Sequence, residues 1–491
     1  MAFRDINRYQ LVLENQLEDW VSSDNPVRFI SALVLKIYND KPHLFQSDKG
    51  HKKTGRRAYN PASMLMLFLY GYLYRINSSR RLEQETYRNM EIIWLLGNEH
   101  PDHKTISDFR KDNAKLISGI AKEFRMFLKS TGYIDGGLQA YDGTKIKACT
   151  NKNFINQREV EKRIAEIESQ LQGYLKMLEE NDKTEDLEAA QIMQESQEIA
   201  FLKSQIEELT SQLKDQEAFL SMMREQQIKD YYANDPEAKR MKSLDGFIPA
   251  YNVQTGVDDK YKMITSCFVS TDEGDQHLLA DNVEASKNQI EVYPDIALAD
   301  KGYATADEIT KVEQNQVTTC VVAMPETLNM KKEAEGVSFE YDQEEDCFIC
   351  ANNQKLVFSS RRDSKDGEIL IYKVQKNPCK QCPLFGKCTK DKKAGRKLQL
   401  KPNFKDLMRY RARSKTEAYQ RLVEHRKAII EHVFGTLKIW MGKIPFLLTS
   451  KKQVQIEIDL YATCYNLRRL LNIGGVPELM EKLKNYQIMT V

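Results

Sequence analysis

The sequence predicts an α/β protein of the α+β type, in which helices flank a mixed sheet, with a helical N-terminal domain and two inserted units. Apolar side chains recur at helical spacing over the first 130 or so residues. Strand-like and helix-like segments then alternate, and two stretches of different composition interrupt them. With 491 residues the chain exceeds what one hydrophobic core usually supports, so several structural units are expected.

The N-terminal domain is assigned to residues 1–132. Residues 26–38 carry apolar side chains at helical spacing, and 61–70 begin a buried helix with proline in its first turn. Residues 78–83 and 103–110 are typical of capped helix starts with exposed basic side chains. This pattern is compatible with a helix-turn-helix that binds DNA ends, although an ordinary helical packing domain would share it.

A catalytic core is assigned to residues 133–157, 235–328 and 404–475. Its expected strands are 136–148, 247–257, 261–271, 295–300 and 317–324, and its expected helices are 276–290, 306–315 and 416–440. The order is strand, strand, strand, helix, strand, helix, strand, helix. This order is that of an RNase H-like mixed sheet covered by helices.

Two units interrupt the core, and residues 476–491 are left as a C-terminal tail. In the first unit, 158–234, two apolar stripes flank a polar break at 181–186. The stripes are Ile164, Ile167, Leu171, Tyr174 and Leu178, then Leu202, Ile206, Leu209 and Leu213. They favour an antiparallel coiled-coil hairpin, although a dimerising coiled coil would show similar spacing. The second unit, 329–403, is rich in cysteine and lysine.

Composition limits the location and the partners of the protein. The 73 basic and 71 acidic residues give a net charge of +2, so the distribution of charge matters more than its sum. Acidic residues gather in 159–237, and basic residues gather in 51–57 and 387–452, which predicts local surfaces that can meet phosphates. The longest apolar runs, such as 64–74, are too short to span a membrane and lack a secretory cleavage pattern. We therefore expect a cytoplasmic protein with no membrane partner.

Three acidic residues are the candidate catalytic groups. Asp142 lies in the first expected strand before Gly143, and Asp300 directly follows a buried strand. Glu431 lies close to the apolar face of the last core helix. Taken singly, such residues usually form turns or face water. Together, they predict a site for two divalent cations that can cut a phosphodiester, because Mg²⁺ prefers carboxylate oxygen and retains positions for water and phosphate.

The cysteines predict a second metal site. Cys347 and Cys350 form one C-x₂-C pair, Cys379 and Cys382 form another after 28 intervening residues, and Cys388 follows. This spacing suits tetrahedral zinc, and simple pairing would choose the first four, although reduced thiols without metal are the alternative. Lysines and arginines follow at 390–401 and suggest a DNA clamp or, otherwise, a solvated loop.

Three blocks carry a family resemblance. Tyr141-Asp-Gly-Thr-Lys, Ala299-Asp-Lys-Gly-Tyr303 and the segment from Arg426 to Lys438 resemble the signature blocks of DDE insertion-sequence transposases, most closely the insertion-sequence 1182 family. Residues 101–110 and 251–258 resemble further blocks of that family. Related groups place arginine four residues before the catalytic glutamate, where this chain has Lys427, with Arg426 one step earlier.

The resemblance implies a DNA transposase with an RNase H-like core that uses Mg²⁺ or Mn²⁺, two per active site. Asp142 would bridge both ions, Asp300 would bind one and Glu431 the other. The DNA-binding candidates are Lys145, Tyr303, which could stack on a displaced base, Arg426, Lys427 and Lys438. The resemblance also implies zinc on Cys350, Cys379, Cys382 and Cys388.

The expected partners are double-stranded DNA, as terminal inverted repeats and target, and a second copy of the chain on that DNA. The expected location is the bacterial cytoplasm, with nucleoid association when DNA is bound. An inactive or repurposed DNA-binding protein is one alternative function. A metal-dependent nuclease without strand transfer is the other.

Overall fold

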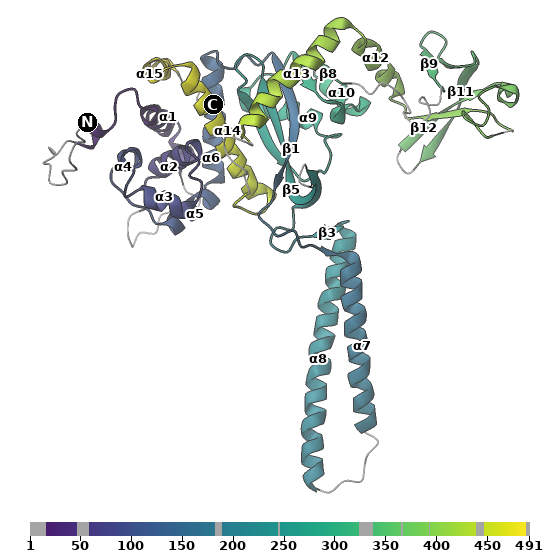
Figure 1. Ribbon diagram of the computed structural model, residues 1–491, viewed down its shortest axis with the longest axis horizontal. Coiled ribbons are helices and arrows are strands. Elements are labelled where there is room, and N and C mark those ends of the chain that lie inside the picture. Colours follow the sequence, from purple (N-terminus) through teal and green to yellow (C-terminus); the bar gives the residue numbers. More distant parts are fainter. Residues whose placement is uncertain are drawn as a thin grey trace, which may run out of the picture.

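The structure, a computed structural model, places a helical lobe, a central sheet, a projecting helical hairpin and a small second sheet along the chain (Figure 1). It describes residues 16–46, 58–181, 189–243, 246–323, 337–364, 367–391, 393–437 and 446–487. Among the helices in these ranges, none is both long enough and apolar enough to cross a membrane.

The N-terminal lobe is helical, as predicted. Its elements are η1 (Leu17–Trp20), α1 (Pro26–Asp40), η2 (Pro42–Phe45), α2 (Pro61–Leu73), α3 (Ser79–Glu85), α4 (Met90–Leu96), α5 (His103–Asp112) and α6 (Ala114–Ser130). The Asn25 and Asn60 side chains cap α1 and α2 by accepting backbone N–H bonds, and each helix has proline in its first turn. Arg110 differs from the expectation of exposed basic residues, because it is only 4% exposed and donates to the Tyr72 hydroxyl.

The C-terminal helices complete the core of this lobe. Apolar side chains of α14 (Lys451–Ile473) and α15 (Val476–Asn485) pack in one cluster with those of α1, α2 and α6. Val476, Leu479 and Leu483 are the buried residues of α15. The described part of the segment assigned as a tail is therefore largely a packed helix, and α14 joins the lobe to the central sheet.

The central sheet is mixed, as predicted, and has the strand order β4-β5-β1-β7-β8, with β6 also paired to β5. The strands are β1 (Leu138–Lys147), β4 (Lys239–Ser243), β5 (Gly246–Asp258), β6 (Ile264–Ser270), β7 (Ile296–Ala299) and β8 (Thr319–Val322). β1 is antiparallel to β5 and parallel to β7, and β7 is parallel to β8. β1 is therefore the central strand, with the antiparallel strand β5 on one side and the parallel strand β7 on the other.

Helices cover both faces of the central sheet. α13 (Glu417–Gly435) and α14 share a core with one face, where Ala140, Val253 and Leu298 lie. α9 (Leu279–Ile290) and α10 (Ala306–Glu313) share a core with the other face, where Tyr141 and Ala299 lie. α12 (Phe404–Ser414) precedes α13, and η3 (Lys301–Tyr303) follows β7. Consecutive residues of a strand therefore meet different helices.

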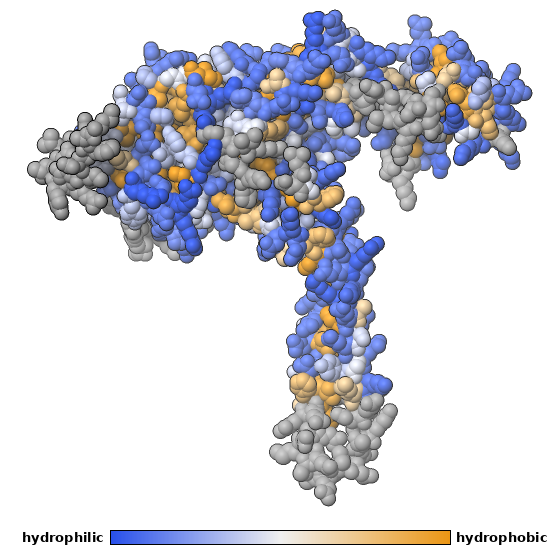
Figure 2. All heavy atoms as spheres, in the orientation of Figure 1, coloured by the Kyte–Doolittle hydropathy of each residue, from blue (hydrophilic) through white to orange (hydrophobic). Residues whose placement is uncertain are grey.

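A helical hairpin projects from the base of the sheet (Figure 1). β2 (Ile155–Asn156) pairs with β3 (Asp230–Tyr231) where the hairpin begins and ends. Between them, α7 (Gln157–Asn181) and α8 (Ala189–Glu225) pack together, and Arg224 bridges to Glu161 at 2.7 Å. Figure 2 shows a mainly hydrophilic hairpin surface with apolar side chains toward its far end, where Leu175, Met177 and Phe201 are exposed.

The small second sheet is antiparallel and has the order β13-β12-β11-β10-β9. Its strands are β9 (Phe339–Asp342), β10 (Cys347–Cys350), β11 (Lys355–Ser364), β12 (Gly367–Val374) and β13 (Lys397–Leu400), with η4 (Pro378–Gln381) between the last two. Its core contains Phe348, Leu356 and Tyr372, together with Phe404 of α12. The cysteine-rich segment thus has an apolar core of its own.

Candidate active site

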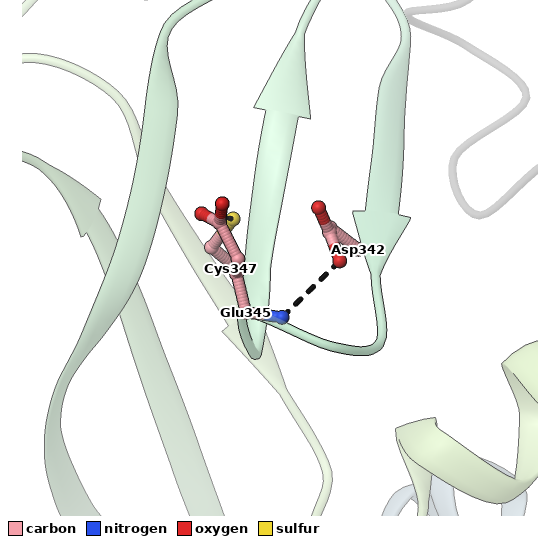
Figure 3. Close-up of side chains that lie close together, drawn as sticks. All are labelled: Asp342, Glu345 and Cys347. Carbon is pink, nitrogen blue, oxygen red and sulfur yellow. Dashed lines mark hydrogen bonds between the residues drawn. The ribbon is translucent and has the colours of Figure 1, made fainter.

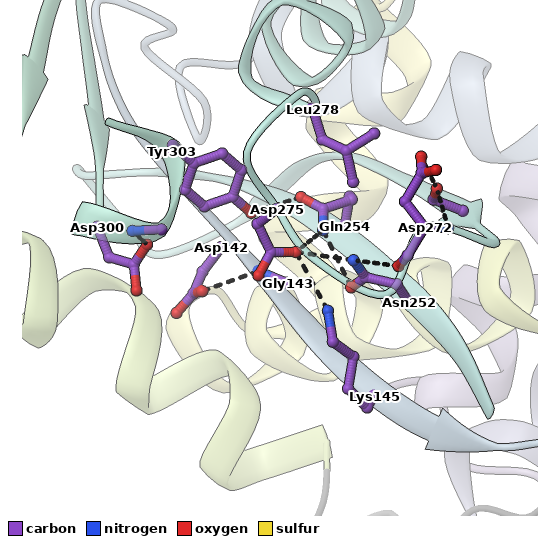
Figure 4. Close-up of polar contacts among 12 residues, drawn as sticks. Asp142, Gly143, Lys145, Asn252, Gln254, Asp272, Asp275, Leu278, Asp300 and Tyr303 are labelled. Carbon is purple, nitrogen blue, oxygen red and sulfur yellow. Dashed lines mark hydrogen bonds and ion pairs between the residues drawn. The ribbon is translucent and has the colours of Figure 1, made fainter. Parts of the chain in front are cut away.

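Two parallel strands bring Asp142 and Asp300 side by side. Tyr141 of β1 is in register with Ala299 of β7, and each aspartate is the next residue along its strand. Asp142 lies within β1, whereas Asp300 follows β7 and caps η3 by accepting the Gly302 N–H at 2.7 Å. Figure 4 shows the two carboxylates near each other at this end of β7. The strand register therefore brings the two carboxylates close together.

The surroundings of Asp142 disfavour its negative charge when no cation is bound beside it. Burial raises the pKa of Asp142 above its usual value, the nearby Arg426 lowers it, and the charge of Asp300 raises it. The side chain of Asp142 is 23% exposed, and it accepts a 2.8 Å bond from the Gly143 N–H. Two neighbouring carboxylates that are partly removed from water favour a bound cation.

Helix α13 supplies the one positive group that contacts Asp142 among the described ion pairs. Arg426 Nη1 lies 3.2 Å from Asp142 Oδ2, and the arginine side chain is only 14% exposed. Arg426 shares the inner face of α13 with Ile429, Ile430 and Val433, which are buried against the sheet. The packing of this face fixes which residues of α13 meet the carboxylates.

Glu431 lies elsewhere on α13. It is exposed, and it follows Arg426 by five residues, which corresponds to about 140° around a helix. Among described residues, the metal-type cluster with ligand atoms within 4.8 Å of one another is a different one, Asp342, Glu345 and Cys347. The structure thus brings together two of the three predicted acids, and the catalytic role of Glu431 stays a prediction.

The predicted DNA-binding residues occupy different environments. Lys145 is paired with Asp275 at 3.3 Å, and Lys427 is exposed. Tyr303 is fully buried, which leaves no ring surface for a base in this conformation and indicates a packing role. Lys438 lies outside the described residues.

Sequence reasoning missed a polar group on the opposite face of the sheet. Asp275, in the loop before α9, accepts bonds from Asn252 and Gln254 of β5, each at 2.7 Å. Gln254 is fully buried. A signal was present in the sequence, because Asn252 and Gln254 lie in a strand whose preceding residues, 247–251, are all apolar or aromatic.

Four cysteines, one on β10 of the small sheet and three on or after η4, line one cavity. Cys350, Cys379, Cys382 and Cys388 all line it, together with Arg396. Burial raises the pKa of the Cys388 thiol, Arg396 lowers it, and the other three cysteines raise it. Cys347 is buried and does not line this cavity. The placement favours the set that the resemblance implies over simple pairing of the first four cysteines.

Cys347 belongs instead to the group in Figure 3 with Asp342 and Glu345. Asp342 Oδ1 accepts the Glu345 N–H at 3.2 Å, which is a turn interaction. Glu345 is exposed and ion-paired with Lys355. Since both acids already have partners, this is a weaker candidate metal site than the four-cysteine cavity.

Comparison with protein families gives two matches. Residues 15–112 match the family described as Transposase domain (DUF772), and residues 349–471 match Transposase DDE domain. These matches support a DDE transposase. The second match includes the four cysteines of the cavity, Arg426 and Glu431, whereas Asp142 and Asp300 precede it. No curated protein matches the chain.

Proposed function

We propose that this transposase binds the ends of its element, cuts the DNA and joins the 3′ ends to a target through Asp142, Asp300 and Glu431. The proposal includes an RNase H-like core and similarity to the insertion-sequence 1182 family. One observation carries it: two acids lie side by side on parallel strands, in a chain whose other segments match transposase families.

The residues present fit divalent cations. Asp142 and Asp300 offer oxygen donors, which suit Mg²⁺ or Mn²⁺, and the Arg426 guanidinium already occupies the cationic position beside Asp142. Asp142, Asp300 and Glu431 would hold two ions. When bound, such ions supply an activated water or 3′-hydroxyl and neutralise charge on the phosphate.

The protein groups contribute binding and orientation. Arg426 can pair with a phosphate in two parallel bonds, which Lys427 cannot do. Lys145, Lys427 and Lys438 would add positive charge along the DNA. Tyr303 is buried and would contribute by packing beneath the site. No serine or cysteine nucleophile is needed, because positioning and charge neutralisation supply most of the catalysis of phosphoryl transfer.

A zinc ion on Cys350, Cys379, Cys382 and Cys388 is part of the proposal. The cavity that these thiols share supports it, because four sulfur donors are the usual ligand set of a closed structural site. Zinc would hold η4 and the segment after it against β10, because Cys350 lies on β10, Cys379 on η4, and Cys382 and Cys388 follow η4. Basic residues of 390–401 would then meet DNA.

The proposed partners are terminal inverted repeats, target DNA and a second copy of the chain on that DNA, because two ends must be handled together. The proposed place of action is the bacterial nucleoid.

The test uses a labelled candidate end, cut and uncut, with Mg²⁺ and a target plasmid. Joining of the pre-cut 3′ end to the plasmid is the expected result. Hydrolysis without joining would identify a nuclease, and DNA binding without either reaction would identify an inactive DNA-binding protein. Both results would overturn the proposal.

A further inference from the structure

A buried polar network links the two segments that carry Asp142 and Asp300. Gln254 is at its centre, on the middle of β5, and its side chain has no exposed surface. Its amide nitrogen donates to Asp275 at 2.7 Å and to Asn252 at 3.0 Å. Its amide oxygen accepts from the Tyr303 hydroxyl and from Asn282. Both ends of this amide are therefore satisfied.

One arm of the network reaches the strand of Asp142. Gly143 is in register with Gln254, and a Cβ at this glycine would lie 2.6 Å from Asp275 Oδ1 and 2.8 Å from Asn252 Oδ1. The absence of a side chain thus lets the carboxylate and both amides pack directly against the backbone that follows Asp142 (Figure 4). Lys145, two residues further, also donates to Asp275.

The other arm reaches the turn of Asp300. Tyr303 is the last residue of η3, which Asp300 caps, so the aspartate and the tyrosine belong to one short turn. The Tyr303 ring packs with Tyr141, Ala299 and Val322, and its hydroxyl donates to Gln254. A displacement of η3 relative to β1 would break this bond inside an apolar environment, where a lost partner is costly.

We propose that Tyr303, Gln254 and Asp275 are positioning residues that fix the separation of Asp142 and Asp300. Asp142 contacts Arg426 of α13 on one side of the sheet, and the network packs against the segments of both aspartates from the other side. Carboxylates that share ions must be held within about 0.5 Å of their working geometry, and a fully satisfied buried network provides such rigidity. The inference rests on the proposed function and assigns Tyr303 a role other than base stacking.

The test compares Tyr303→Phe with Tyr141→Phe. Both tyrosines are fully buried, and each hydroxyl donates to a glutamine, Gln254 for Tyr303 and Gln139 for Tyr141. Only the first substitution cuts the network, and it retains the aromatic ring. Strand transfer gives kcat and KM, and calorimetry on DNA-free protein gives the affinity for Mn²⁺.

Tyr303→Phe should lower kcat by about tenfold with KM within about twofold, and should weaken Mn²⁺ binding by about tenfold. Tyr141→Phe should stay within about twofold of wild type in both. If the wild-type protein joins DNA and the two variants have equal kcat and Mn²⁺ affinity, the inference is overturned and the proposed function is not. A wild-type protein that binds Mn²⁺ without joining DNA would overturn the proposed function, and the Mn²⁺ affinities would then decide the inference.

A second variant guards against loss of fold. If Tyr303→Phe melts far below Tyr141→Phe, Asp275→Ala replaces it, because this change removes the oxygen that accepts from Asn252 and Gln254. Asp275→Asn is its control, since it removes the charge and keeps an accepting oxygen. Weaker Mn²⁺ binding at an unchanged melting temperature supports the inference. Wild-type affinity in Asp275→Ala, equal affinities in Asp275→Ala and Asp275→Asn, or a wild-type protein that binds no Mn²⁺, overturns it.

Discussion

The strand-borne acids and the helix-borne acid of the candidate site differ in what positions them. Asp142 and Asp300 sit on hydrogen-bonded neighbouring strands whose register places them together. Glu431 depends on the rotation of α13, and that rotation follows from burial of Ile429, Ile430 and Val433. The comparison teaches that a sheet assembles catalytic groups through its backbone, whereas a helix does so only through its side-chain packing.

The largest expected effect comes from the acids themselves. Asp142→Asn, Asp300→Asn and Glu431→Gln should each lower the rate of strand transfer by about 10³-fold or more, since each removes a charged oxygen ligand. Single-turnover rates on pre-cut ends measure this. Glu424→Gln is the matched control for the helix, because Glu424 is also exposed and lies two turns before Glu431.

Unequal results would sharpen the comparison. Near wild-type rates in both Glu431→Gln and Glu424→Gln, with inactive aspartate variants, would remove Glu431 from the site and leave a purely strand-borne one. Activity retained by either aspartate variant would instead remove that aspartate from the site and show that strand register alone does not identify a catalytic group.

The cysteines extend the comparison to groups borne mainly on loops. Joint replacement of Cys379 and Cys382 by serine should lower bound zinc from about one per chain to below about a tenth, because two of four thiolates are lost. Elemental analysis of purified protein measures it. Cys347→Ser is the control, since Cys347 lies apart from the cavity. Loss of zinc in Cys347→Ser instead would identify the other ligand set.

A buried acid on α14 shows what burial on a helix costs when no cation among the described residues pairs with the carboxyl group. Burial raises the pKa of Glu457 from 4.5 to about 7, although Arg110 and the N–H groups of Leu448 and Leu447 lower it. The native state therefore keeps a proton that the unfolded chain loses, so its stabilisation is complete below pH 4.5 and is lost as the pH rises toward 7. We expect the free energy of unfolding to fall by on the order of 2–3 kcal/mol over this window.

Glu457→Gln should remove this fall, because glutamine does not ionise. Denaturant unfolding at several pH values measures the difference between variant and wild type. Glu478→Gln, at an exposed acid paired with Lys482, should keep the wild-type slope. Identical slopes in wild type and Glu457→Gln would show that Glu457 titrates normally.

The smallest effect concerns Arg426, where helix and strand meet. Arg426→Met removes the cation beside Asp142 and keeps much of the apolar stem, so Mn²⁺ should bind about 3–10-fold more tightly at pH 8. DNA should bind more weakly. Arg421→Met serves as the control, because Arg421 is exposed and pairs with Glu417 on the same helix. Unchanged Mn²⁺ affinity in Arg426→Met would show that the guanidinium does not compete for Asp142.

Much of the fold followed from local patterns. The alternation in 247–257 and the apolar run 295–300 predicted β5 and β7 to within a few residues, because strand periodicity and turn residues are local signals. The packing of α15 into the N-terminal core could not be predicted in this way, because an apolar stripe on a helix does not specify which element will cover it. Arg110 looked exposed for the same reason: its partners Tyr72 and Asn77 are more than 30 residues away.

The candidate site divides in the same way. The sequence by itself determined which residues can supply charge and donor atoms, namely the acids, the cysteines and the basic segments, because residue type fixes both. Only the tertiary structure decided that Asp142 meets Asp300 and Arg426, that Tyr303 is buried, and that Gln254 joins the two acidic segments. The physical reason is that these contacts arise from strand register and helix packing between distant segments, whose energies depend on neighbours that no local pattern specifies.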